Sequence, residues 1–328
     1  MKAAVYYETG APSVFRYEDV PEPVVSADEL LVRVEAISIE GGDTLNRLRG
    51  DMSATPHIVG YQASGTVVDV GANVSDFAVG DRVVTLGMNG SHAELRAVYP
   101  SFCWKIPANV SMEVAAAVPT AYGTAHDSLF EFGRLSAGET ALIHAGASGV
   151  GIAAIQMAKD AGARVLATAS SAERLERLRE YGLDEGINYR EDDFALRVRE
   201  LTSGQGADVI VDSVGGSNLQ KSLLALAYRG RCVSFGDAGR EESASLDISS
   251  MRGQNQAFTS YFLGAELFLG TRAHAVIETI LQDVAADRWR VVINRTYPLA
   301  DAEEAHAYIE SRQAFGRVLL IPWAPSRG

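Results

Sequence analysis

A glycine-rich stretch near the middle of the chain, HAGASGVGIAAIQMAK at residues 144–159, constrains the fold more than any other feature. An apolar strand pattern ends at Ala145, the glycines Gly146, Gly149 and Gly151 follow, and an amphipathic helix pattern starts inside the turn. A helix that starts at such a turn presents its free backbone N–H groups and the positive end of its dipole. Because glycine permits close approach to the backbone, the stretch predicts a pyrophosphate-binding turn.

Ser148 departs from the glycine pattern of dinucleotide-binding turns, G-x-G-x-x-G, because it stands where the second glycine is expected. A glycine-rich turn without a ligand is therefore an alternative. The residues after the turn favour a binding site: Val150 and Ala154 belong to an apolar helix face, and Gly162 is placed to end that helix. The whole first βαβ unit of a nucleotide-binding fold is thus present in the sequence.

Apolar strands, turns and amphipathic helices alternate from about Thr140 onward. Strands are predicted at residues 141–146, 164–170, 187–189, 208–216 and 231–236. Helices are predicted between them at 149–161, 171–181, 191–202 and 217–229. This order predicts the α/β class, with a doubly wound, mainly parallel sheet that helices cover on both faces.

The first hundred residues carry a different pattern, in which short alternating strands are separated by Gly and Pro. These strands are predicted at 30–39, 63–71, 80–87 and 91–99, a spacing typical of a compact, barrel-like β domain. After Gly270, a helix near 272–287 and a last strand at 316–322 are predicted. We expect these closing elements to rejoin the first domain.

The end of the second strand distinguishes the two nicotinamide cofactors. NAD sites usually carry an Asp or Glu about 20 residues after the glycines, whereas here Ala169, Ser170 and Ser171 stand at the strand tip and Arg174 follows. Hydroxyls and a guanidinium suit a 2′-phosphate, which a carboxylate would repel, so the strand tip predicts NADPH. The alternative is a capping box of Ser170 and Glu173 with a solvated Arg174, although capping and phosphate binding can coexist.

Composition narrows the class of protein. With 328 residues, of which 47% are hydrophobic, the chain is long enough for two globular domains. The start MKAAVYYETG lacks a secretory pattern, and we expect a cytoplasmic protein. Cys103 and Cys232 are too few for a disulfide framework or a thiolate zinc site, and we expect both in the core. The net charge of −13 disfavours a nucleic-acid partner.

Five blocks of the chain together resemble the medium-chain dehydrogenase/reductase superfamily, in its zinc-free quinone oxidoreductase branch. They are HAGASGVG, GYQASGTVVDVGANVSDFAVGDRVV at 60–84, AAAVPTAYGTAHDSL at 115–129, ASSAERLERLREYGLDEGINYRED at 169–192 and YPLADAEEAHAYIESRQAFGRVLL at 297–320. The resemblance implies a GroES-like catalytic domain at 1–120, completed by 266–328. It also implies an inserted Rossmann NADPH-binding domain at 121–265, with the active site in the cleft.

The same resemblance implies a set of cofactor contacts. The adenosine 2′-phosphate is expected at Ser170, Arg174 and Tyr189, with Ser171 beside them. The pyrophosphate is expected at Gly146, Ser148, Gly149, Val150 and Gly151. The nicotinamide is expected to be lined by Thr120, Val214 and Phe235, with Gly316 and Arg317 closing over it.

The zinc ligands of related dehydrogenases are replaced in this chain. Zinc-dependent members place a Cys, a Gly-His-Glu and a further ligand where this sequence has Glu40, Gly60-Tyr61-Gln62 and Ala116. Without those ligands no Lewis acid would polarise an alkoxide, so alcohol dehydrogenation is disfavoured. We expect metal-free hydride transfer from NADPH to a quinone or an α,β-unsaturated carbonyl compound.

The candidates for proton transfer are Glu40, Asp43 and Tyr61. Relatives often have Asn at position 40 and Tyr at position 45, where this chain has Glu40 and Leu45. Two carboxyls flanking a glycine pair could raise each other's pKa, but solvated acids in a turn are the alternative, and Asp43 is expected to order the loop. Tyr61 replaces the zinc-ligating histidine, and it either faces the substrate or serves in packing.

The aromatic segment at 258–270 is expected to start the strand and helix through which the protein forms a homodimer. Tyr261 and Phe262 are possible pocket residues instead, and His144 is expected to be a satisfied core residue. Two other functions stay open. One is an enoyl-thioester reductase of fatty-acid or polyketide chemistry, and the other is an NADPH-binding sensor or structural protein without turnover.

Overall fold

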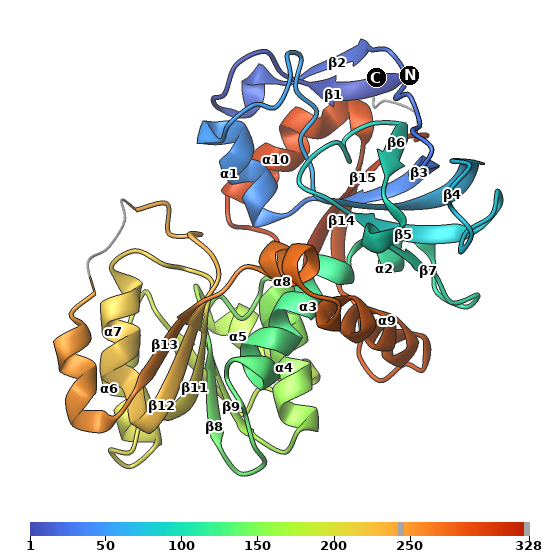
Figure 1. Cartoon of the computed structure of the whole chain (residues 1–328). Helices are drawn as coiled ribbons and strands as arrows, with labels where there is room; N and C mark the ends of the chain where they lie inside the picture. Colours follow the sequence, from blue (N-terminus) through green and yellow to red (C-terminus); the bar gives the residue numbers. More distant parts are fainter. Residues whose placement is uncertain (242–245, 325–328) are drawn as a thin grey trace. The chain divides into compact units, whose positions relative to one another are not determined.

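The computed structural model describes residues 1–241 and 246–324, which form two compact units (Figure 1). One unit contains residues 1–120 together with 264–328, and the other contains residues 121–263. The first unit is therefore assembled from two segments that lie far apart in the sequence. We call it the split unit and call the other the inserted unit.

The inserted unit is built on a parallel sheet, whose strands in the described part of the chain follow the order β10-β9-β8-β11-β12-β13. All neighbouring pairs are parallel. The strands are β8 (Thr140–Ile143), β9 (Arg164–Ala169), β10 (Glu185–Asn188), β11 (Ala207–Asp212), β12 (Leu226–Ser234) and β13 (Ala257–Ser260). The order is that of a doubly wound dinucleotide-binding fold, with the switch point between β8 and β11.

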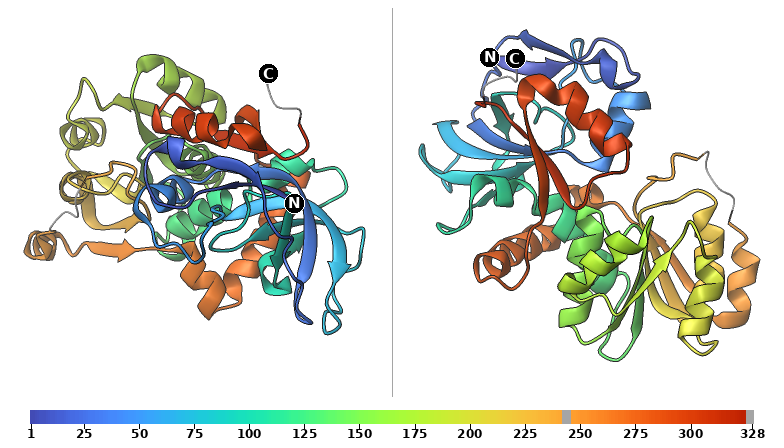
Figure 2. Two further views of the ribbon diagram at one scale, coloured as in Figure 1. Left: turned by 90° about the horizontal axis from the view of Figure 1, so that it is seen from above. Right: turned by 180° about the vertical axis from the view of Figure 1, so that it is seen from behind.

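Helices cover both faces of this sheet, with α4 and α5 on one side and α6 and α7 on the other (Figures 1 and 2). They are α4 (Gly149–Asp160), α5 (Ala172–Leu178), α6 (Phe194–Leu201) and α7 (Asn218–Ala225). Because helices cover both faces, the central strands are buried along almost their whole length rather than at alternate positions. On one face, Leu142, Leu166 and Ile210 of the sheet share a core with Phe194 and Leu223 of the helices. The predicted α/β class is confirmed.

The predicted helix at 217–229 is too long. In the structure α7 ends at Ala225, and the backbone of Leu226 is already extended where β12 begins. The register between β11 and β12 shifts so that Val209 lies opposite Arg231, which leaves a bulge in which Arg229 has a φ of 60°. The sequence ALAYRG has apolar residues compatible with either period, so the pattern alone could not place this boundary.

The split unit contains a mixed sheet in which the described strands follow the order β14-β15-β3-β4-β5-β7, with β6 paired to β3. Its members are β3 (Leu30–Ser38), β4 (Gln62–Val70), β5 (Arg82–Leu86), β6 (Leu95–Val98), β7 (Cys103–Lys105), β14 (Ile293–Pro298) and β15 (Arg317–Ile321). A separate antiparallel pair joins β1 (Lys2–Val5) and β2 (Arg16–Asp19). Strand β15 lies between β14 and β3, so the closing elements and the first strands of the chain share one sheet.

Short helices complete the split unit. They are α1 (Gly41–Arg49), α2 (Met112–Ala116), α9 (Arg272–Ala285) and α10 (Ala302–Glu310). Two further helices, α3 (Pro119–His126) and α8 (Leu263–Leu269), contain the points at which the chain passes from one unit to the other. Within the described residues, no helix has the length and apolar character needed to cross a membrane.

Candidate cofactor and active site

The cofactor residues predicted in the inserted unit gather at the carboxyl ends of the parallel strands. Ser170 follows β9 and Tyr189 follows β10, and the last residues of these strands, Ala169 and Asn188, are paired. Val214 and Phe235 follow the ends of β11 and β12, which are paired in the same way. The glycine turn follows β8, between these two groups. The fold therefore brings the predicted residues to the edge where such sheets bind nucleotides.

The glycine turn leads directly into α4, as predicted. Ser148 is the N-cap residue of this helix, and its hydroxyl accepts a hydrogen bond from the backbone N–H of Gly151 at 3.0 Å. This cap explains why a serine interrupts the glycine pattern, because serine is a preferred N-cap residue. A Cβ on Gly151 would lie 2.5 Å from the carbonyl oxygen of Ala145 and 2.7 Å from the Cα of Gly146. The tight turn leaves a helix N-terminus that fits a diphosphate.

After β9, the N-cap residue of helix α5 is Ser171 rather than Ser170. The Ser171 hydroxyl accepts from the backbone N–H of Arg174 at 3.4 Å, so the alternative capping box of Ser170 and Glu173 is wrong. Tyr189 is 42% exposed, and its backbone N–H donates to Ala169 at 3.2 Å. Ser170 and Tyr189 thus flank the tips of two paired strands near the start of α5. Their contact with a 2′-phosphate remains a prediction.

A hydrogen-bonded turn follows β11, where the nicotinamide is predicted. Asp212 accepts from the backbone N–H groups of Val214 at 2.7 Å and Gly215 at 3.0 Å, and the N–H of Phe235 donates to the Asp212 carbonyl at 3.0 Å. Asp212 is not among the residues predicted from the sequence. The signal was its position as an acid at the end of an apolar strand and immediately before a turn. His144 is buried with both ring nitrogens hydrogen-bonded, as expected.

The split unit holds the candidate proton-transfer residues. Glu40 is the N-cap residue of α1, and its backbone N–H donates to Oδ2 of Asp43 at 2.8 Å. Oδ1 of Asp43 accepts from the backbone N–H of Tyr61 at 3.1 Å. Glu40 is 4% exposed and Asp43 is fully buried at 0%, so the alternative of solvated turn acids is wrong. Asp43 fixes the loop before α1 to the start of β4, which agrees with its expected ordering role.

Glu40 also receives donors from three other side chains. Its Oε1 accepts from Nε2 of Gln62 at 2.5 Å and from Oγ of Ser38 at 3.5 Å, and it forms an ion pair with Arg317. Arg317 also donates to the hydroxyl of Ser38 and the carbonyl of Ile39. Before Arg317, Gly316 has a φ of 94°, which favours glycine. Closure of Gly316 and Arg317 over a nicotinamide remains a prediction, and the structure places the guanidinium on Glu40.

Burial changes the acidity of this cluster. Burial raises the pKa of Asp43 to about 8, against the opposing effect of the Glu40 N–H that it accepts. Burial also raises the pKa of Glu40, and the charge of Arg317 opposes that rise. Burial raises the pKa of the Tyr61 hydroxyl to about 12, and the nearby Asp43 adds to this shift. Tyr61 therefore keeps its proton at neutral pH.

Tyr61 packs over the first turn of α1. A Cβ on Gly42 would lie 2.5 Å from the Tyr61 ring and hydroxyl oxygen, so this position has no room for a side chain. The Tyr61 hydroxyl accepts from Nδ2 of Asn46 at 3.1 Å, which leaves its own proton free for another acceptor. The Tyr61 ring therefore packs against α1, and its hydroxyl group can still donate a proton.

Gln62 links this cluster to Thr120. Its Oε1 accepts from the backbone N–H of Thr120 at 2.9 Å, while its Nε2 donates to Glu40. The Thr120 hydroxyl is buried and has no hydrogen-bond partner within the residues that the structure describes. From the sequence, Gln62 was identified only as a replaced zinc position. The polar residue in the triplet Gly60-Tyr61-Gln62 was the available signal.

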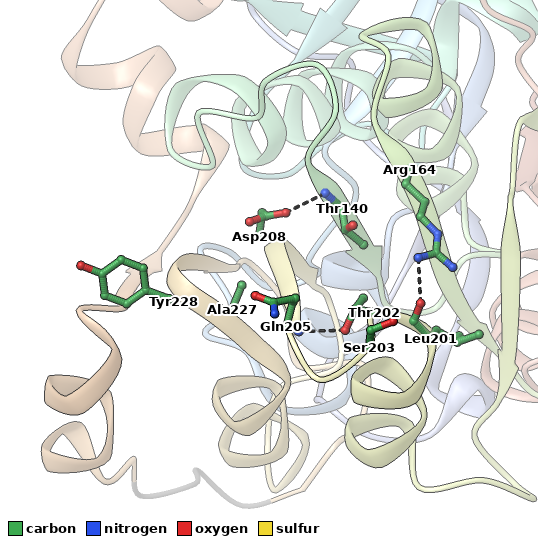
Figure 3. A pocket seen from close by; sticks show the side chains of 10 residues that line it. Thr140, Arg164, Leu201, Thr202, Ser203, Gln205, Asp208, Ala227 and Tyr228 are labelled. Atoms are coloured by element: carbon green, nitrogen blue, oxygen red, sulfur yellow. Dashed lines mark hydrogen bonds between the residues drawn. The ribbon is translucent and has the colours of Figure 1, made fainter.

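A cavity of about 450 Å³ opens at the opposite, amino end of the parallel sheet (Figure 3). It is lined by residues at the starts of β8, β9, β11 and β12, including Thr140, Arg164, Asp208 and Ala227. Arg164 donates to the Leu201 carbonyl at 2.8 Å, and Asp208 accepts from the Thr140 N–H at 2.8 Å. Because the glycine turn lies at the carboxyl end of the same strands, this cavity is not part of the predicted cofactor site.

Two family models match the chain. Residues 26–108 match the alcohol dehydrogenase GroES-like domain, and residues 149–287 match the zinc-binding dehydrogenase family. A 2-haloacrylate reductase from Burkholderia is 31% identical over 98% of this chain and 99% of its own length. A quinone oxidoreductase from Pseudomonas aeruginosa is 33% identical over 95% of this chain and 97% of its own length.

A solved structure extends this similarity to the three-dimensional level. A mycobacterial protein in complex with NADPH superposes with a TM-score of 0.92 at 35% sequence identity. The match covers 98% of this chain and all of the other. With the GroES-like family match, the superposition confirms the predicted combination of a Rossmann-type sheet and a GroES-like domain.

Proposed function

Because the chain belongs to the medium-chain dehydrogenase/reductase superfamily, in the branch of the quinone oxidoreductases, we propose that it is an NADPH-dependent reductase of quinones or α,β-unsaturated carbonyl compounds. The observation that carries this proposal is the glycine turn at the start of α4. A Cβ on Gly151 would clash with the backbone of Ala145 and Gly146 inside this turn. The backbone N–H groups of the first helical turn are available to a diphosphate.

The inserted unit would hold NADPH through residues at one edge of the sheet. Gly146, Ser148, Gly149, Val150 and Gly151 would contact the pyrophosphate, and Ser170, Ser171, Arg174 and Tyr189 would surround the 2′-phosphate. Val214 and Phe235 would position the nicotinamide within this unit. The roles of Thr120, Gly316 and Arg317 at the nicotinamide remain predictions. Bound NADPH supplies the hydride that adds to an electron-poor carbon of the acceptor.

Tyr61 is the proton donor in this proposal. Its hydroxyl stays protonated at neutral pH, and its single described partner, Asn46, donates to it rather than competing for its proton. Asp43 fixes the Tyr61 backbone, and Glu40 holds Arg317, so these two acids position the site rather than transfer a proton. Proton delivery from solvent is the competing route.

The residue types support chemistry without zinc. Glu40, Tyr61 and Ala116 stand where zinc-dependent relatives place their ligands, and alanine has no donor atom. Glu40 has the only carboxylate among these three positions, and it already forms an ion pair with Arg317 and accepts a hydrogen bond from Gln62.

The proposed partners are a small acceptor and a second copy of this chain in the cytoplasm, with neither nucleic acid nor membrane. Strand β13 is the last strand of the described sheet, and its outer edge pairs with no other described strand, so we infer that it is available to a strand of a second copy. Phe262 beside this edge is 51% exposed. Tyr261 is buried instead and its hydroxyl donates to Asp127 at 3.0 Å, which disfavours a pocket role for this residue. Light scattering of the purified protein would test the dimer.

The function is tested by following the loss of NADPH absorbance with a small quinone, an enone and an enoyl thioester. We expect turnover with the quinone or the enone and a slower reaction with the thioester. Faster turnover of the thioester would favour the enoyl-thioester reductase. Calorimetry with NADPH and no acceptor tests the remaining alternative, an NADPH-binding sensor or structural protein. Binding of NADPH without turnover of any acceptor would identify such a protein, and the absence of binding would refute the proposal.

A further inference from the structure

Four buried polar side chains form one continuous hydrogen-bonded path beneath the carboxyl edge of the parallel sheet. They are Thr168 on β9, His144 just after β8, Ser222 on α7 and Asp212 at the end of β11. Nδ1 of His144 lies 3.1 Å from the Thr168 hydroxyl, and Nε2 lies 3.1 Å from the Ser222 hydroxyl. The Ser222 hydroxyl in turn lies 3.0 Å from Oδ2 of Asp212. We call these four residues the strand-end relay.

The direction of every hydrogen bond in the strand-end relay follows from its acid end. Asp212 accepts, so the hydroxyl of Ser222 donates to it and must accept from Nε2–H of His144. Nδ1 of His144 then carries no proton and accepts from the hydroxyl of Thr168. Burial lowers the pKa of His144, which favours this neutral form. The relay therefore has a single polarity and requires one tautomer of His144.

Each end of the strand-end relay holds one of the turns assigned to the cofactor. At one end, the Thr168 hydroxyl accepts from the backbone N–H of Ala145 at 3.2 Å, and the Thr168 carbonyl accepts from Gly146 at 2.9 Å. At the other end, Asp212 accepts from the backbone N–H groups of Val214 and Gly215. The path thus runs from the glycine turn to the turn after β11, across the switch point of the sheet.

We propose that His144 is a positioning residue, which holds the pyrophosphate-binding turn and the nicotinamide-binding turn at a fixed spacing through the strand-end relay. The proposal rests on the function proposed above and adds a residue that touches neither substrate nor cofactor. A histidine suits this place because its ring offers one acceptor and one donor on opposite sides, and the Phe194 ring packs edge-on against it at 4.6 Å between centroids. Loss of any link would let the two turns relax independently.

Two near-isosteric variants test the proposal, Thr168→Val and Ser222→Ala, each of which removes one hydroxyl from the strand-end relay. We expect each to raise the dissociation constant of NADPH by about three- to tenfold, the range of one lost hydrogen bond. The double variant should lose scarcely more than either single one, because both break the same path. Calorimetric titration with NADPH alone measures these constants without any acceptor.

Two control variants distinguish the loss of a relay hydroxyl from general destabilisation of the protein. Thr168→Ser retains the hydroxyl. Its dissociation constant for NADPH should stay within about twofold of that of the original chain, which is less than the effect of one lost hydrogen bond. Ser128→Ala removes a buried hydroxyl of the same unit that has no hydrogen-bond partner among the described residues, and it should leave the affinity unchanged. Equal affinities for Thr168→Val, Ser222→Ala and Ser128→Ala would overturn the proposal.

Nitrogen-15 NMR of histidine-labelled protein gives a readout that simple destabilisation would not change. We expect His144 to carry its proton on Nε2, with the signal assigned by its disappearance in His144→Gln. Ser222→Ala should reduce this preference, whereas Ser128→Ala should retain it. A proton on Nδ1 of the original chain would refute the relay, and failure of the original chain to bind NADPH would instead refute the proposed function.

Discussion

Arg317 and Glu40 form a buried ion pair although 277 residues separate them in the sequence. Their side chains are only 8% and 5% exposed, and Gln62 and Ser38 supply further hydrogen bonds to Glu40. The pair joins the start of β15 to the segment that follows β3. Removal of one partner would leave the other charge buried without compensation.

The first prediction concerns this ion pair. Glu40→Gln should lower the free energy of unfolding by about 3–5 kcal/mol, because it isolates the buried charge of Arg317. Urea denaturation measures the change. Asp19→Asn, which breaks the exposed pair of Asp19 with Lys2 in the same unit, should leave the free energy of unfolding nearly unchanged, because solvent screens this pair. Equal losses in the two variants would contradict the structural role of Glu40.

The second prediction is a pH dependence caused by Asp43. Its pKa is about 8 in the folded protein and 3.8 as the ordinary value, so between these values the folded state holds a proton that the unfolded state releases. Asp43 should therefore contribute a negative slope to the free energy of unfolding between about pH 5 and 8, of up to about 1.4 kcal/mol per pH unit. Asp43→Asn should flatten this slope, and exposed Asp69→Asn should not. A slope unchanged by Asp43→Asn would refute the assignment.

The third prediction concerns the glycine turn. Gly151→Ala should weaken NADPH binding and destabilise the protein by about 1–3 kcal/mol, because the new methyl group meets the backbone of Ala145 and Gly146. Gly253→Ala is the matched control, since a Cβ at that position meets no atom within 4 Å. Calorimetry and thermal unfolding of both variants check the result. Full NADPH affinity in Gly151→Ala would exclude the turn as the diphosphate site.

The fourth prediction separates the two nicotinamide cofactors. Arg174→Ala should weaken NADPH binding about tenfold or more while leaving NADH nearly unaffected, because the guanidinium pairs with the 2′-phosphate that NADH lacks. Arg177→Ala removes an exposed arginine of the same helix and should change neither affinity. If Arg174→Ala weakened both cofactors equally, the assignment of the 2′-phosphate would be wrong.

The fifth prediction tests the proton donor. Tyr61→Phe should reduce kcat by about 100-fold or more if its hydroxyl protonates the reduced acceptor. The dissociation constant of NADPH should stay the same, since Tyr61 is not a proposed cofactor contact. Tyr17→Phe, which removes a hydroxyl from β2 of the same unit, should have no effect. An unchanged kcat in Tyr61→Phe would identify solvent as the proton source.

Local rules were sufficient to predict the parallel sheet and its glycine turn. Each strand of the inserted unit is a short apolar run, and each helix has a polar face, so the period of the pattern identifies them. The position of Ser148 at the start of a helix also follows from a local preference. The boundary between α7 and β12 did not follow, because it depends on the register shift against β11.

The cluster around Glu40 required the three-dimensional structure. Glu40, Gln62 and Arg317 lie on three segments, and a sequence pattern cannot show that they share hydrogen bonds. Two acids beside glycines therefore suggested an exposed turn as readily as a buried site. The same limit applies to Asp212, whose role depends on donors from the turn and from α7.

The place of β15 beside β3 affects how the chain acquires its structure during synthesis. Ser38 and Arg317 are 279 residues apart, which corresponds to roughly 15–55 seconds of translation. Residues 121–263 emerge within that interval, so a nascent chain completes the inserted unit while the edge of β3 still lacks its partner. On the ribosome, the middle of this polypeptide is thus ready to fold before its beginning.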